Sequence, residues 1–424
     1  MSMEYGNKLN PIRKLRKAKG IKGERMTVYN THNPDTIDPN GILTVRFPDL
    51  GPHDVIIPGT AKLSFKIALN ALADANRTIV NNLGRAIVSK IEVKLEGQSV
   101  YTLNDSDIFH CYQDLWMTQQ ERENSVYQGI QSEALRKIRI NAGDKGANAS
   151  DVALGDAYSN LFSIPLDFEL LEANMPFHQY DLKDRLSYEL TFNNYGNVIV
   201  SSDNTATYTI TGISMEFEVL NSKALAMDIK QKQKGRHIVL YDRVIRHTKL
   251  PLNKNESTWN ITLAPQAFSM KGILIIFKEP QTAFNGDSED FYNPKITKVS
   301  TTIDGKPNQI YSSGMRAHQQ FHEIRKHFSD GKNRDAINVA KEFDLADVTA
   351  AEYFTNKYAL WLDFRSNDDL TLHGSGRKIE GASQSIQIEI EKTAQAAGAL
   401  NPYIYYIADA QLNFENGRLV NVAY

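Results

Sequence analysis

Apolar residues at every second position are the feature that most restricts what this chain can fold into. Such alternation places one face of an extended strand against a core and leaves the other face polar. The pattern recurs at residues 63–69, 188–192 and 213–219, and again at 259–263 and 386–390. Because no regular helix pattern alternates with these segments, the sequence favours antiparallel β-sandwiches over an α/β sheet.

The strand-like segments form two clusters, one on each side of residues 223–236. The end of this intervening segment has Lys230, Lys232, Lys234 and Arg236 interleaved with glutamines and closed by Gly235, and the segment has too little apolar content to join a core. A chain of 424 residues is also long enough for two domains. We therefore predict a basic arm at 1–40, a first domain at 41–222, a linker at 223–236 and a second domain at 237–424.

Two segments half a chain apart share one pattern. Residues 90–98 read as a strand that ends in an acidic residue followed by glycine, and residues 298–306 repeat this order 208 positions later. Apolar residues at helical spacing follow each of them, at 108–115 and at 321–328. A tandem duplication of one sandwich explains the repeat, and a coincidence between two common strand turns is the alternative.

The N-terminal segment is strongly basic. Eight basic residues and one acid lie between Lys8 and Arg25, a local charge of +7 in a chain whose net charge is −2. Such a segment favours a polyanion or an acidic surface as partner, with a solvated tail as the alternative. Because no nucleic-acid recognition motif accompanies it, we expect contacts that are independent of nucleotide sequence. The candidate contact residues are Arg13, Lys14, Arg16, Lys17, Lys19, Lys22 and Arg25.

Four residues of the second half form the densest group of potential metal ligands: His318, His322, Glu323 and His327. His318 and His322 would share one helix face. A zinc protease signature, however, requires Glu directly after the first His, where this chain has Gln319. We therefore interpret these histidines as helix-surface or interface residues.

Other candidate sites are also weak. Residues 374–378 (GSGRK) lack the spacing of a phosphate-binding loop, and Asp368 and Asp369 lie in loop-like sequence. Cys111 is the single cysteine, cannot form an internal disulfide and occupies an apolar helix position where a buried thiol is expected. The sequence thus predicts no catalytic, cofactor-binding or metal site, no cofactor and no enzyme. No apolar run is long enough for a membrane-spanning helix.

Several stretches share a pattern with one family of proteins: 81–98 (NNLGRAIVSKIEVKLEGQ), 161–166 (LFSIPL) with 174–177 (NMPF) and 188–192 (YELTF), and 412–418 (LNFENGR) with 422–424 (VAY). The first resembles a segment of the first jelly roll in major capsid proteins of nucleocytoplasmic large DNA viruses, polintons and adintoviruses. The others are similar to a proline-bearing strand with its apolar turn and to the closing strand. Glu96 stands where the large-virus proteins usually have a second glycine, so a small relative such as a polinton is the better comparison.

The resemblance implies an all-β fold of two tandem eight-stranded antiparallel jelly rolls with short helices in loops. It also implies a structural major capsid protein whose homotrimers form pseudo-hexameric capsomers in the icosahedral shell of a double-stranded DNA virus. The expected partners are neighbouring capsomers, penton and minor capsid proteins, with the arm on the genome or an internal membrane. The expected location is the virion capsid, after assembly in the cytoplasm or nucleus of the host cell.

Two alternatives belong to other functional classes. A receptor- or glycan-binding spike, or a minor capsid protein, would use the same sandwiches without tiling a shell. A metal enzyme would depend on the group from His318 to His327.

Overall fold

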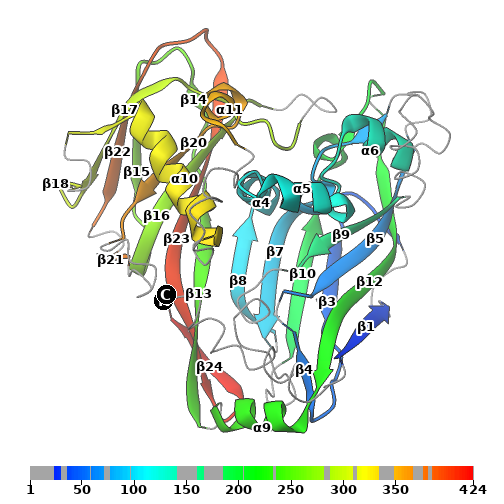
Figure 1. The fold of residues 1–424 in the computed structure, drawn as a ribbon. Helices are drawn as coiled ribbons and strands as arrows, with labels where there is room; N and C mark the ends of the chain where they lie inside the picture. The colour runs from blue at the N-terminus through cyan, green and yellow to red at the C-terminus, as the bar shows by residue number, and fades with distance from the viewer. Residues whose placement is uncertain are drawn as a thin grey trace.

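The computed structural model places two β-sandwiches side by side (Figure 1). The structure describes residues 23–29, 36–57, 59–70, 77–95, 97–140, 160–166, 185–203, 205–232, 235–280, 287–308, 313–333, 348–365, 376–380 and 384–423.

The first half contains β1 (Gly23–Tyr29), β2 (Thr36–Ile37), β3 (Ile42–Arg46), β4 (Asp54–Ile56), β5 (Lys62–Leu69), β6 (Thr78–Ile79), β7 (Val88–Leu95), β8 (Gln98–Asn104), β9 (Leu161–Pro165), β10 (Leu186–Phe192), β11 (Ile199–Val200) and β12 (Tyr208–Asn221). One sheet has the order β1-β12-β5-β9, and β2 and β4 also pair with β12. The facing sheet has the order β3-β10-β7-β8, and β6 pairs with β11.

The second half contains β13 (Arg236–His247), β14 (Leu252–Asn253), β15 (Thr258–Leu263), β16 (Gln266–Lys278), β17 (Ile296–Ile303), β18 (Lys306–Pro307), β19 (Met315–Arg316), β20 (Ala359–Asp363), β21 (Arg377–Glu380), β22 (Ile386–Lys392), β23 (Ala399–Glu415) and β24 (Arg418–Ala423). One sheet has the order β13-β23-β16-β20, with β14 and β24 on β23 and β21 on β16. The other has the order β15-β22-β17-β18, with β19 on β17.

The helices are few and lie outside the sheets. They are α3 (Leu83–Ala86), α4 (Ser106–Asp114), α5 (Gln119–Asn124), α6 (Glu133–Ile140), α9 (Lys223–Lys232), α10 (Ala317–Asn333) and α11 (Ala350–Asn356), with 3-10 turns η1 (Val126–Gln128) and η3 (Tyr195–Asn197). Capping boxes built on Thr118 and Thr349 begin α5 and α11. Within the described residues, no helix has the length and apolar character needed to cross a bilayer.

The two halves have the same strand order. The sheets β1-β12-β5-β9 and β3-β10-β7-β8 correspond to β13-β23-β16-β20 and β15-β22-β17-β18. β7 and β17 are both eight residues long and begin and end 208 positions apart. Each leads into a turn with a left-handed glycine, Gly97 at φ +87° and Gly305 at φ +70°. The predicted repeat of one antiparallel sandwich is therefore confirmed.

The helices α4 and α10 correspond as well. Lys90 of β7 lies opposite Asn104 of β8, and the equivalent Lys298 of β17 lies opposite Arg316 of β19. Beyond the turn, equivalent residues of the two halves are therefore 212 positions apart in sequence. This offset aligns Phe109 with Phe321, Tyr112 with Ile324 and Trp116 with Phe328. In both halves these side chains are buried or half-buried, so the duplication extends beyond the strands.

The arm predicted at 1–40 is too long. β1 pairs with β12 over seven residues, from Gly23 opposite Leu220 to Tyr29 opposite Ser214. β2 also pairs with β12 and buries Ile37. The basic residues hid this strand in the sequence, because a strand is held to its neighbour by backbone hydrogen bonds, whatever charge its side chains carry.

The expectation that residues 223–236 join no core is also wrong. α9, at the bottom of Figure 1, buries Leu225, Ala226 and Ile229 in a small cluster with Val55 and Leu220. Three apolar residues on one face of a short helix are enough to cover the ends of two strands. No described strand of β1–β12 pairs with one of β13–β24. The domain limits drawn from the sequence nevertheless stay a prediction.

Candidate functional site

Six of the seven predicted contact residues of the basic segment, from Arg13 to Lys22, lie outside the described residues. The seventh, Arg25, lies on β1 opposite Glu218 of β12. Arg25 therefore belongs to a strand of the first sandwich and not to an arm that precedes it.

The histidines of the second half occupy different surroundings. His318 and His322 are exposed on α10. His327 stacks on Trp361 with ring centroids 3.7 Å apart and an interplanar angle of 13°. Desolvation there, together with the charges of Arg365 and Lys271, lowers the pKa of His327 to about 3. A neutral ring packed on tryptophan is thus the role of His327, and no group of three or more His, Cys, Asp or Glu in the described part of the chain could hold a metal.

Cys111 is another of the candidates from the sequence. Cys111 is buried, and burial, followed by the charge of Glu289, raises the pKa of its thiol well above the usual value. A neutral buried thiol is a poor nucleophile. The described residues do not include the pair Asp368 and Asp369, nor Gly374 and Ser375 of the glycine-rich segment.

The most extensive arrangement of buried polar and aromatic side chains is the contact between the two halves. We call this contact the seam. The first half contributes β8 and the segment from α3 to α5, and the second contributes β13, β23, residues 288–291 and α10. The buried apolar residues of both halves form one continuous cluster across the seam.

Aromatic rings form the centre of the seam. Phe109 of α4 lies 5.2 Å from Tyr405 of β23, measured between ring centroids. Tyr112 lies 5.2 Å from Phe291 in an edge-to-face arrangement, and Trp116 stacks on Phe328 of α10 at 6.4 Å. Buried aromatic pairs of this kind each contribute about 0.5–1.5 kcal/mol beyond the area that they bury.

Hydrogen bonds fix the orientation of the two halves along β13 and β23. The Tyr405 hydroxyl donates to the Asp105 carbonyl oxygen at 2.8 Å, and Arg246 Nε donates to Asp105 Oδ2 at 2.8 Å. The Tyr241 hydroxyl donates to the Val100 carbonyl oxygen at 2.6 Å. Each bond joins residues more than a hundred positions apart, so none could be read from a local motif.

A buried ion pair lies in the seam. Arg122 Nη2 donates to Glu289 Oε2 at 2.8 Å, and Asn81 Nδ2 donates to the same oxygen at 2.9 Å. Burial raises the pKa of Glu289, and the charge of Arg122 opposes this effect. A buried carboxylate needs a cation and hydrogen bonds to remain ionised. The contribution of Glu289 to the stability of the seam therefore depends on Arg122.

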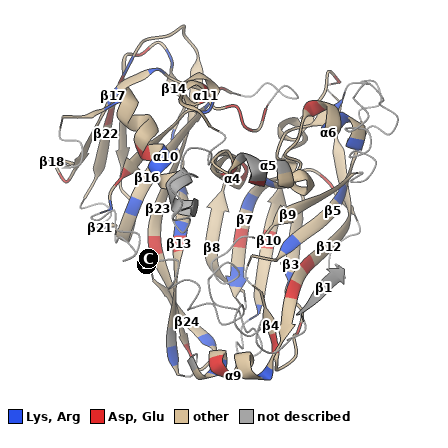
Figure 2. Cartoon of the chain, in the orientation of Figure 1, with Lys and Arg blue, Asp and Glu red and all other residues tan. Residues whose placement is uncertain are grey.

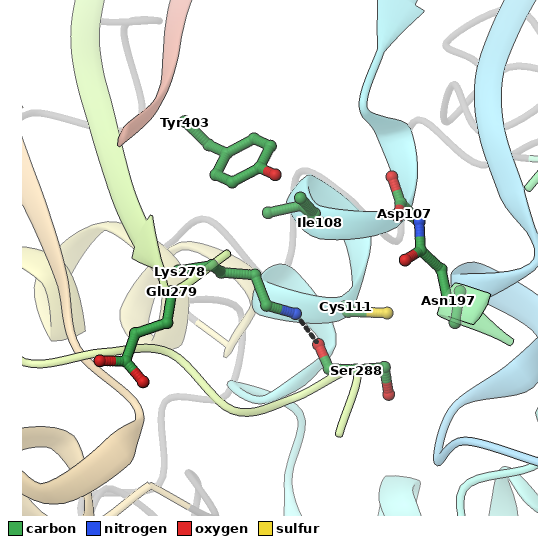
Figure 3. Close-up of a pocket in the computed structure, with 9 residues that line it drawn as sticks. Asp107, Ile108, Cys111, Asn197, Lys278, Glu279, Ser288 and Tyr403 are labelled. Atoms are coloured by element: carbon green, nitrogen blue, oxygen red, sulfur yellow. Dashed lines mark hydrogen bonds between the residues drawn. The ribbon is translucent and has the colours of Figure 1, made fainter. Parts of the chain in front are cut away.

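A cavity of about 100 Å³ lies in the seam, between α4 and the end of β16. Figure 3 shows Asp107, Cys111, Lys278 and Tyr403 around it, from both halves of the chain. Burial raises the pKa of Asp107 to about 7, and the charge of Lys278 acts in the opposite direction. A polar cavity of this size is large enough to admit water.

The outer face of β23 explains why the seam forms there. On this side of the sheet, α4 and α10 cover five large apolar or aromatic side chains of β16, β20 and β23. We call them the covered face: Leu274, Ile276, Trp361, Tyr403 and Tyr405. One signal of this burial is present in the sequence. The run Tyr403-Ile404-Tyr405-Tyr406 has large side chains on both faces of a strand, which indicates burial on both sides.

The equivalent face of the first half is more exposed in the part of the chain that the structure describes. The register places Lys66, Ala68, Thr209, Thr211 and Leu161 at the positions of the covered face, and we call them the open face. Lys66 and Ala68 are exposed, and Leu161 keeps 46% of its surface accessible. Basic residues of β5 and acidic residues of β12 surround this face (Figure 2), including Lys62 and Glu216, which pair at 3.4 Å.

Comparison with known proteins by sequence found no relative: no family model matches the chain, and no curated protein matches it.

Comparison with solved structures found the same architecture in virus capsid proteins. The chain is similar to VP54 of PBCV-1, in a crystal structure fitted into a reconstruction of the virophage Sputnik, with a TM-score of 0.59 and 10% identity over 95% of this chain and 97% of that chain. The Faustovirus major capsid protein gives a TM-score of 0.57 and 9% identity over 98% of both chains. The mavirus major capsid protein gives 0.50 and 11%, covering 92% of this chain and 88% of that chain. The predicted double jelly-roll fold is therefore confirmed over nearly the whole chain.

Proposed function

We propose that the chain is the major capsid protein of an icosahedral double-stranded DNA virus. The observation that carries this proposal is the likeness of both sandwiches, in one arrangement, to major capsid proteins over almost their full length. A fold shared by a part of the chain would support only a common module. A likeness that extends over both halves also supports a common use of their arrangement.

The geometry supports a structural role. Two equivalent sandwiches give one chain two similar sides, and three chains joined as a homotrimer then present six. Such pseudo-hexameric units tile a closed shell with few kinds of contact. The seam suits this role because it is apolar at its centre, as permanent interfaces are, and because Arg122 and Glu289 form an ion pair across it.

The shape and mass of the purified protein test the proposal. Light scattering is expected to give the mass of three chains, and negative-stain images are expected to show pseudo-hexagonal particles or empty shells. Isolated knobs that never tile would instead support the receptor- or glycan-binding spike. A stable monomer at high concentration that forms no particles would contradict the capsid proposal.

The basic segment supports a further partner. We propose that Arg13, Lys14, Arg16, Lys17, Lys19 and Lys22 face the inside of the shell and bind the genome or the headgroups of an internal membrane through charge alone. Neighbouring capsomers, penton and minor capsid proteins would meet the outer edges of the trimer. In this proposal the protein is located in the virion and assembles inside the host cell.

Deletion of residues 1–22 tests this contact without removing β1. We expect particles that form normally but bind DNA and anionic vesicles less tightly at low salt, because +6 of charge from the candidate residues is lost. Deletion of residues 1–29 is the control for the fold, because it also removes β1 and is expected to abolish soluble protein. If the shorter deletion bound DNA and anionic vesicles as tightly as the whole chain and packaged the same amount of DNA, the contact would be excluded.

A further inference from the structure

The helix α9 joins the two halves at one end of the molecule (Figure 1). Its inner side buries three apolar side chains, which are Leu225, Ala226 and Ile229. On its outer side Lys223, Met227 and Lys230 are exposed, and Met227 keeps 52% of its surface accessible. Residues three and four positions apart are neighbours on a helix, so these three form one stripe. The helix therefore presents an apolar side chain between two lysines, on the side away from the core.

The connection that contains α9 is basic. Residues 223–236 carry five basic residues and one acid, a local charge of +4. Two nearby acids have partners of their own. Glu415 Oε1 lies 3.8 Å from Arg236 Nε, and Asp54 Oδ1 accepts a hydrogen bond from Asn221 at 2.7 Å. The charge of the connection stays positive when both acids are subtracted, so this end of the molecule attracts anions.

The basic segment before β1 joins the molecule at the same end. Gly23, the first residue of β1, lies opposite Leu220 of β12, and α9 begins three residues after Leu220. From Lys8 to Lys22 the chain carries seven basic residues and no acid. Two basic segments that are far apart in the sequence therefore leave the first sandwich at one place.

An anionic lipid surface fits both the lysines and the methionine. The phosphate groups of lipids and of DNA attract lysine alike. A lipid headgroup layer also accepts apolar side chains, which sink about 5–10 Å into it beside basic residues. Exposed apolar side chains continue at this end of the molecule, with Ile238 near the start of β13 at 52% and Val420 of β24 at 57%. The DNA backbone offers the charge without an apolar layer, so the lipid is the better fit.

We propose that α9 lies flat on an anionic lipid surface, with Lys223 and Lys230 at the headgroups and Met227 inserted between them. The site deepens the proposed function and rests on it, because that function places the basic segment on the inner side of a shell. α9 and the basic segment then hold the chain at two joined points. Two linked contacts bind more tightly than either one alone.

Charge reversal of the two lysines tests the surface. The full chain is mixed with vesicles of phosphatidylcholine, with or without phosphatidylglycerol, and bound protein is measured by flotation. Lys223→Glu with Lys230→Glu is expected to weaken binding to the anionic vesicles about tenfold or more, while circular dichroism stays unchanged. The matched control is Lys306→Glu with Lys378→Glu, which reverses two exposed lysines of β18 and β21 and is expected to bind as the wild type does.

Changes at Met227 separate insertion from attraction by charge. The emission of Met227→Trp is expected to move to shorter wavelength on anionic vesicles and to stay in place on duplex DNA, because only the lipid removes the new ring from water. The native tryptophans Trp116, Trp259 and Trp361 are buried, so they give a constant background. Met227→Ala is expected to weaken vesicle binding about threefold. This loss persists at high salt, where the contribution of the lysines is screened.

Two results would overturn the lipid contact. One is equal vesicle binding by the wild type and the lysine variant, and the other is an emission of Met227→Trp that does not respond to vesicles. Loss of DNA binding together with the second result would assign the surface to nucleic acid. If the glutamate variant fails to fold, Lys223→Gln with Lys230→Gln replaces it. A chain that forms neither trimers nor shells would instead overturn the proposed function, whatever the vesicles show.

Discussion

The open face and the covered face have the same backbone and opposite environments. Lys66 and Leu274 occupy equivalent positions on β5 and β16, each in the middle of an antiparallel sheet. Lys66 is exposed, whereas Leu274 is fully buried. The difference arises from α4 and α10, which cover one sheet and not the other. Duplication of a sandwich thus preserved the strands while each outer face adapted to what lies against it.

The largest expected difference between the two faces is in the free energy of unfolding. Tyr405→Ala removes a ring packed on Phe109 and the hydroxyl bound to the Asp105 carbonyl, and we expect a loss of about 3–5 kcal/mol. The matched change Thr211→Ala is expected to alter stability by less than about 0.5 kcal/mol. Guanidinium unfolding of the unassembled chain measures both values. Similar losses at the two positions would contradict the comparison.

A smaller difference is expected between the ion pairs of the two regions. Arg122→Ala leaves Glu289 buried without its cation, and we expect a loss of about 3 kcal/mol. Lys62→Ala breaks the pair with Glu216 beside the open face, where the side chains are 31% and 18% exposed, and is expected to cost less than about 1 kcal/mol. Thermal unfolding at low and high salt measures how strongly each ion pair depends on salt. The Lys62 effect is expected to shrink in salt, and a Lys62 loss as large as that of Arg122 would argue against a distinct seam.

The last prediction concerns the pH dependence of the seam. The pKa of Asp107 is raised to about 7, so the folded chain holds a proton that the unfolded chain releases near pH 4. Asp107 therefore makes stability fall as pH rises from about 4 to about 7, and its full cost is present above pH 7. Asp107→Asn removes this titration, so the stability of the variant relative to the wild type is expected to rise by at least about 1 kcal/mol between pH 4 and pH 8.

The control for this measurement is Asp38→Asn, which changes an exposed carboxylate outside the seam. Stability curves at several pH values for the two variants and the wild type separate the effect of Asp107 from the pH dependence of the rest of the chain. Parallel curves for Asp107→Asn and the wild type would show that Asp107 does not control this dependence.

The strands were the most predictable part of the molecule. Leu63, Phe65 and Ile67 alternate with polar residues, and the structure buries all three on the inner face of β5. The position of the histidines on a helix was likewise visible, since Phe321, Ile324 and Phe328 recur at helical spacing. β1 was missed because its few apolar residues follow a run of basic residues, and α9 was missed because its short apolar stretch runs into the lysines and glutamines that follow it. The segments around Asp105, Arg122 and Glu289 gave no signal of a seam.

The sequence by itself determined that the chain is all β, that its strands fall into two sets and that one sandwich pattern occurs twice. These properties depend on side-chain periods and turn residues that lie within about ten positions of one another. The tertiary structure alone decided which outer face is covered. Tyr405 donates a hydrogen bond to Asp105, which lies 300 positions earlier in the sequence. The burial of a second sheet face depends on which distant helix packs against it. The free energy of that packing depends on residues far apart in sequence, so a local pattern cannot predict it.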